Sequence, residues 1–120
     1  MTKYGLDPDT WQAAKAEMRE LVVQCARSEA LMTYGELAAM MTVISPHPGA
    51  YAFQALLREM CREAEQAGHG MLCALVVSKA TGMPGAGFFK ALIYDGVDCS
   101  DQHACWQEQV QQVYAYWRDA

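Results

Sequence analysis

Apolar residues recur every three or four positions in four stretches of the chain, a spacing that places them on one face of a helix. The four stretches cover residues 10–28, 34–41, 49–67 and 101–118. Asp9 or Thr10 is suited to cap the first helix, because either side chain accepts backbone N–H bonds. Thr33 and Glu36 form the reciprocal capping-box pattern at the start of the second. Gly68 is suited to end the third, so we predict four helices with defined boundaries.

The pattern changes between the third and the fourth helix. Residues 71–78, MLCALVVS, are a continuous apolar run of strand length, which predicts a buried strand. The next nine residues, KATGMPGAG, contain three glycines and a proline and favour tight turns. Residues 88–95, FFKALIYD, are interpreted as a second strand that pairs back on the first, although Lys90-Ala91-Leu92 also suits a helix.

Three helices, a glycine-turn β-hairpin and a C-terminal helix predict an α+β fold of the winged helix-turn-helix type. In that fold the third helix is usually presented to DNA and the hairpin forms the wing. A chain of 120 residues is long enough to bury one core, and neither a linker nor a repeat divides it. We therefore predict a single domain over residues 1–120.

The expected compartment follows from the absence of two sequence signals. No stretch reaches the roughly 18 apolar residues of a membrane helix, and the first residues lack the order of a secretory signal. We expect a cytoplasmic protein that does not contact a membrane.

The five cysteines form an odd set without a C-x-x-C pair, so we expect reduced, mostly buried thiols rather than a disulfide framework. They are Cys25, Cys61, Cys73, Cys99 and Cys105.

The net charge of −5 is spread unevenly along the chain. From Ala91 to the end, five acidic residues face one base, Arg118, which is a balance of −4. Phosphate backbones are bound by clustered lysine and arginine, so this last quarter is unsuited to nucleic acid. A nucleic-acid surface, if the protein has one, is expected in the first three-quarters.

The segment MTYGELAAM, residues 32–40, resembles the start of the helix-turn-helix in the C-terminal domain of O6-alkylguanine-DNA alkyltransferases and alkyltransferase-like proteins. Those proteins open the motif with Thr/Ser-Tyr-x-x-Leu-Ala, and the resemblance covers residues 30–90. It implies a winged-helix DNA-binding domain in which Tyr34 helps to rotate a target nucleotide. The chain departs from the family at the Pro-Cys-His-Arg-Val reactive motif and at the recognition-helix arginine. Cys73 falls near the reactive position without an adjacent histidine, so alkyl transfer is not expected.

Other catalytic patterns are also missing from the sequence. His47, His69 and His103 show no ligand spacing among themselves or with the cysteines, so we expect neither a metal site nor a cofactor. The turn TGMPGAG lacks the lysine and following Ser/Thr of a Walker loop. No nucleophile and base are paired as in a triad. The sequence therefore favours a non-enzymatic interaction domain.

Two hypotheses describe the interaction. In the first, the third helix and the glycine turn bind nucleic acid; in the second, an acidic C-terminal helix binds a protein with a basic surface as an adaptor or inhibitor. The nucleic-acid residues are Tyr34, Arg58, Arg62, Lys79 and Lys90. The partner-binding residues are Met83, Phe88, Tyr116 and Asp119.

Overall fold

The computed structural model of the protein describes residues 4–119. Its first element is helix α1 (Pro8–Arg27), which begins slightly earlier than predicted because Asp7 is the cap. The Asp7 carboxylate accepts a bond of 2.9 Å from the Thr10 N–H, and Pro8 occupies the first turn, where its missing N–H costs nothing. The apolar face of α1 is buried as its spacing predicts.

The predicted second and third helices are confirmed as α2 (Tyr34–Met40) and α3 (Tyr51–Gln66). The capping box is present: the Thr33 hydroxyl accepts from the Glu36 N–H at 3.1 Å, and the Glu36 carboxylate accepts from the Thr33 N–H at 2.9 Å. Gly68, just beyond α3, has a φ of +80°, the left-handed conformation expected of it.

The apolar run at residues 71–78 is not one strand. It forms a 3-10 helix, η1 (Leu72–Leu75), and then strand β2 (Val76–Val77). β2 pairs in parallel with β1 (Met32–Thr33), in the register Met32 to Val76. Its partner strand therefore lies before α2 rather than after the glycine turn. A continuous apolar run predicts burial but not conformation, because a strand and a helix are both apolar on every side when they are completely covered.

The second predicted strand is helix α4 (Ala86–Tyr94). Phe88, Phe89 and Leu92 are its buried residues, and their spacing is that of one helix face. The glycine turn is a compact loop, in which the Ser78 N–H donates to the Met83 carbonyl at 2.8 Å. The winged helix-turn-helix prediction is wrong: within residues 4–119 the fold is mostly helical, with two short parallel strands and no hairpin.

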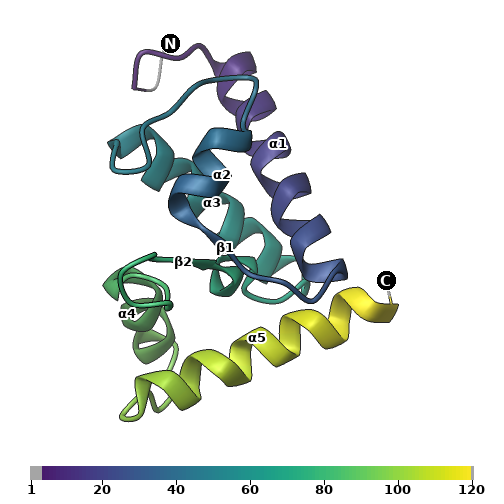
Figure 1. Ribbon diagram of the computed structural model, residues 1–120, viewed down its shortest axis with the longest axis vertical. Coiled ribbons are helices and arrows are strands. Elements are labelled where there is room, and N and C mark those ends of the chain that lie inside the picture. The colour runs from purple at the N-terminus through teal and green to yellow at the C-terminus, as the bar shows by residue number, and fades with distance from the viewer. Residues whose placement is uncertain (1–3, 120) are drawn as a thin grey trace.

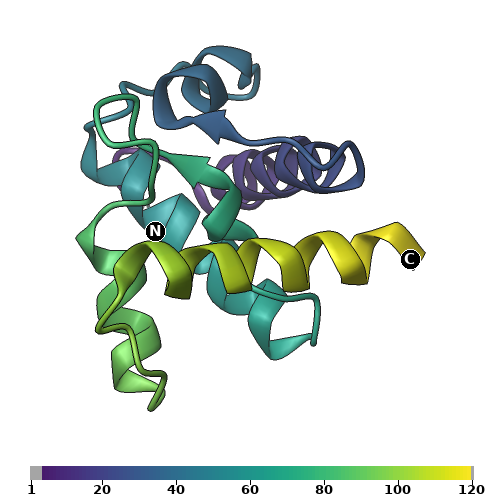
Figure 2. The same ribbon diagram turned by 60° about the horizontal axis from the view of Figure 1, so that its bottom comes forward.

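Helix α5 (Gln102–Asp119) completes the molecule and confirms the predicted C-terminal helix. It crosses beneath α1 to α3 in Figure 1, and Figure 2 shows it running in front of them. The core lies around η1, which contacts α1, α3 and α5. Trp106 links α5 to η1, because its buried indole N–H donates to the Ala74 carbonyl at 2.8 Å. α4 lies near the beginning of α5 (Figures 1 and 2), and its buried face of Phe88, Phe89 and Leu92 joins the same core.

Four of the five cysteines form disulfides, so the expectation of reduced thiols is wrong for them. Cys61 on α3 is bonded to Cys73 in η1, and Cys99 is bonded to Cys105 at the start of α5. Packing decides these pairs by bringing the Cα atoms to 5.5 Å and 5.2 Å, which sequence spacing does not reveal. Cys25 remains free and half-buried, and burial raises the pKa of its thiol.

None of the helices within residues 4–119 combines the length and apolar character of a membrane span.

Candidate functional site: a groove between α3 and α4

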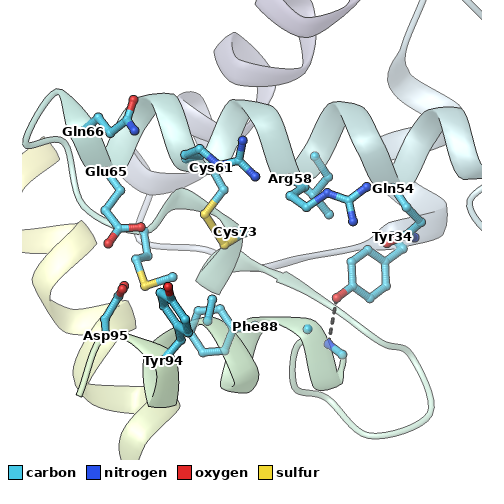
Figure 3. A pocket seen from close by; sticks show the side chains of 16 residues that line it. Tyr34, Gln54, Arg58, Cys61, Glu65, Gln66, Cys73, Phe88, Tyr94 and Asp95 are labelled. Carbon is cyan, nitrogen blue, oxygen red and sulfur yellow. Dashed lines mark hydrogen bonds between the residues drawn. A yellow bond between two sulfur atoms is a disulfide. The ribbon is translucent and has the colours of Figure 1, made fainter. Parts of the chain in front are cut away.

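A groove of about 800 Å³ opens between α3 and α4 (Figure 3). The two helices form its walls, and Tyr34 from the first turn of α2 stands at one end. The Cys61–Cys73 disulfide lies between the walls. Residues from four separate parts of the chain therefore meet here: α2, α3, η1 and the segment around α4.

The Tyr34 end of the groove contains the beginning of α4. The Tyr34 hydroxyl accepts a bond of 2.8 Å from the Gly85 N–H, which fixes the ring beside the helix start (Figure 3). Gly85 is the N-cap of α4, and no side chain caps this helix. Its first turn contains no acidic residue, so its N–H groups carry the positive end of the helix dipole without a carboxylate from the helix itself.

Arg58 and Arg62 add positive charge to the same groove from α3. They lie one helical turn apart, and both side chains are exposed. Among the described residues, neither forms an ion pair or a hydrogen bond with another side chain. Figure 3 shows the Arg58 guanidinium directed toward Tyr34. Two cations without protein partners are thus available to an incoming anion.

The opposite end of the groove is acidic. Glu65 on α3 and Asp95 just after α4 face each other across it (Figure 3). Partial burial raises the pKa of Glu65, and the charge and hydrogen bond of Asp95 raise it further. α3 and α4 run in the same direction along the groove, so both helix dipoles are positive toward Tyr34 and negative toward Asp95. The groove is therefore electrostatically bipolar.

Three of the five residues predicted to bind nucleic acid line this groove: Tyr34, Arg58 and Arg62. Lys79 is exposed in the loop after β2, where its charge is the smallest of several influences on Glu36. The pKa of Glu36 is lowered chiefly by its backbone and side-chain hydrogen bonds with Thr33. Lys90 is exposed on α4 but does not line the groove.

The four predicted partner-binding residues do not form one surface. Phe88 lines the groove but is buried, with its ring edge-on to Phe89 at 5.2 Å between centroids. Met83 is half-buried in the preceding loop. Tyr116 and Asp119 lie at the other end of α5, where Tyr116 stacks on His69. In Figure 1 this end of α5 is far from α4.

Several groove residues were missed from the sequence. Gln54 and Glu65 follow the helical spacing that also carries Arg58 and Arg62, so a search for a polar stripe on α3 would have found them, whereas Cys61 is buried and belongs to the apolar side. The sequence predicts a strand over residues 88–95, so it does not indicate that a helix, α4, faces these residues of α3. The disulfide between the walls likewise depends on the placement of η1.

Within residues 4–119, no three His, Cys, Asp or Glu side chains are grouped closely enough to hold a metal ion. His69 instead accepts from Arg19, at 3.3 Å, and packs edge-on against Trp117. No protein-family model, curated protein or solved structure matches the chain.

Proposed function

We propose that the protein is a nucleic-acid-binding domain that takes a strand end or a short single-stranded segment into the α3–α4 groove. The observation that carries the proposal is the convergence of Arg58, Arg62 and the uncapped start of α4 on one concave site. A phosphate group there would accept charge-assisted hydrogen bonds from guanidinium groups and backbone N–H groups.

The aromatic side chains in the groove favour a nucleotide over a bare anion as its ligand. Tyr34 and Tyr94 line the groove with accessible rings, since Tyr34 is half-buried and Tyr94 is 91% exposed, whereas the Phe88 ring is buried. Bases stack on such rings with little dependence on sequence, at about 1–3 kcal/mol per base. Gln54, at the Tyr34 end, adds a side-chain amide that both donates and accepts hydrogen bonds.

The acidic end limits how much nucleic acid the groove accepts. Glu65 and Asp95 would repel a phosphate backbone that continued along the groove, and the net charge of −5 opposes long-range attraction. A single phosphate at the Tyr34 end, with one or two bases stacked beyond it, avoids this repulsion. We therefore propose terminal or single-stranded nucleotides, not duplex DNA, as the ligand.

The test uses a 5′-phosphorylated tetranucleotide labelled at its 3′ end, with binding followed by fluorescence anisotropy at low salt. Arg58→Ala and Arg62→Ala should each weaken binding about tenfold, the loss expected for a charge-assisted hydrogen bond. Arg118→Ala is the matched control, because Arg118 is paired with Glu29 on another face and its loss should leave affinity unchanged.

Affinity should also fall as salt rises and when the 5′-phosphate is removed. The proposal is overturned if the phosphorylated oligonucleotide does not bind at low salt. It is equally overturned if Arg118→Ala weakens binding as much as the groove variants do.

A further inference from the structure

The two disulfides differ in their access to solvent-borne molecules. Cys61 and Cys73 both line the groove, and Cys73 is only half-buried there. Cys99 and Cys105 are both buried and do not line it. A small solute that enters the groove therefore contacts the Cys61–Cys73 disulfide and not the Cys99–Cys105 disulfide.

The charges around Cys61 distinguish its sulfur from that of Cys73. Arg58 precedes Cys61 by three residues on α3 and Arg62 follows it directly, and both line the same groove. Neighbouring cations stabilise a thiolate, and a thiol of lower pKa is the faster leaving group in disulfide exchange. Glu65, one turn further along, acts in the opposite sense but is directed toward Asp95 (Figure 3). Cys61 is thus the better leaving group, and the more exposed Cys73 is the sulfur open to attack.

We infer that the Cys61–Cys73 disulfide is a site of thiol–disulfide exchange with small thiols that carry a carboxylate. The incoming thiolate forms a bond to Cys73 Sγ, the bond between the two cysteine sulfurs breaks, and its electron pair leaves on Cys61 as a thiolate. A second thiol then attacks the ligand sulfur of this mixed disulfide and releases the Cys73 thiolate. The balance is one protein disulfide and two thiols converted into two protein thiols and one small-molecule disulfide.

A carboxylate is the preferred second group on the ligand because of the arginines. It would bind Arg58 or Arg62 at hydrogen-bond distance and hold the attached thiol beside the disulfide. A cationic thiol would be repelled by the same pair. This activity is separate from nucleotide binding, although it uses the same groove.

The experiment compares thioglycolate, an anionic thiol, with cysteamine, a cationic one, at low salt and without oligonucleotide. After quenching by alkylation, peptide mass mapping gives the rate of opening for each disulfide in the same molecule. Cys99–Cys105 serves as the internal reference, which removes differences in intrinsic reactivity between the two thiols. The rate ratio of Cys61–Cys73 to this reference should be about fivefold higher with thioglycolate than with cysteamine, since an exposed charge pair contributes up to about 1 kcal/mol.

The variant Arg58→Ala/Arg62→Ala should abolish this preference, whereas Arg58→Lys/Arg62→Lys, which keeps both charges, should retain it. Circular dichroism confirms that the variants fold. The mixed disulfide should map to Cys73. Equal ratios for the two thiols, an adduct on Cys61, or equal opening of both disulfides would each overturn the inference. Because no oligonucleotide is present, failure here leaves the nucleic-acid proposal standing, and the reverse also holds.

Discussion

At the scale of single residues, the groove owes its chemistry to side chains on α3 and to Tyr34. The sequence singled out Arg58 and Arg62, because polar residues on the outer side of an amphipathic helix are recognisable from periodicity, and Tyr34 through its resemblance to the alkyltransferase motif. It did not identify Asp95 as the partner of Glu65. That pair forms across the groove, and only the docking of α4 brings the two carboxyl groups together.

The raised pKa of Glu65 predicts how stability changes with pH. Burial and then Asp95 raise this pKa above 4.5, so the folded protein binds the proton more tightly than the unfolded chain does. The resulting stabilisation is fully present below pH 4.5 and is lost as the pH rises through the folded pKa. Glu65→Gln, which is uncharged, should raise the melting temperature at pH 7 by about 1–2 °C, a few tenths of a kcal/mol.

Melting temperatures measured between pH 4 and pH 7 check this prediction. The same substitution at Glu108, an exposed residue on α5, is the control and should leave the pH profile as in the parent protein. If Glu65→Gln and the parent protein show the same profile, the two carboxyl groups are not coupled in solution.

At the scale of elements, local signals predicted the helices well where a cap or a stop is encoded nearby. The capping box of Thr33 and Glu36 and the left-handed Gly68 were both recognised. Residues 71–95 were predicted wrongly because apolar runs without clear periodicity suit a strand, a 3-10 helix or a buried α-helix equally. Their conformation was decided by which neighbours covered them: β1 for Val76, and the core for Phe88 and Phe89.

The disulfide between α3 and η1 should stabilise the pairing of these two elements. Cys61→Ala/Cys73→Ala should lower the free energy of unfolding by about 3 kcal/mol, because the bond closes a loop with a sequence separation of 12. Cys99→Ala/Cys105→Ala, with a separation of 6, should cost about 2 kcal/mol.

Urea denaturation of oxidised protein measures both losses. If the groove variant is as stable as the parent, the Cys61–Cys73 bond does not constrain the unfolded chain and is not formed in the folded protein.

At the scale of the whole molecule, η1 is the element on which α1, α3 and α5 converge. Leu72 and Leu75 are fully buried within it, and the Trp106 indole holds its backbone at Ala74. A 3-10 helix of four residues has little stability of its own, so its conformation depends on this burial. Packing on η1 in turn positions α3, and so one wall of the groove.

Leu72→Ala should therefore lower the free energy of unfolding by about 2–5 kcal/mol, the cost of a cavity at a site that cannot collapse. Leu31→Ala is the matched control, because Leu31 is 42% exposed and its loss should change stability by about 0.5 kcal/mol or less. Urea unfolding should show one transition with an unchanged slope in both variants. Equal losses in the two variants would contradict the central position of η1.

Local patterns in the amino-acid sequence were enough to locate α1, α2, α3 and α5, the capping box of α2 and the two arginines on the exposed side of α3, because each depends on residues within a few positions of one another. The tertiary structure alone decided that β1 pairs with β2, that residues 86–94 form a helix, that four cysteines are bonded, and that the two arginines face α4 across a groove. These features join segments distant in the chain, and their geometry depends on how buried faces fit together, which no local pattern encodes.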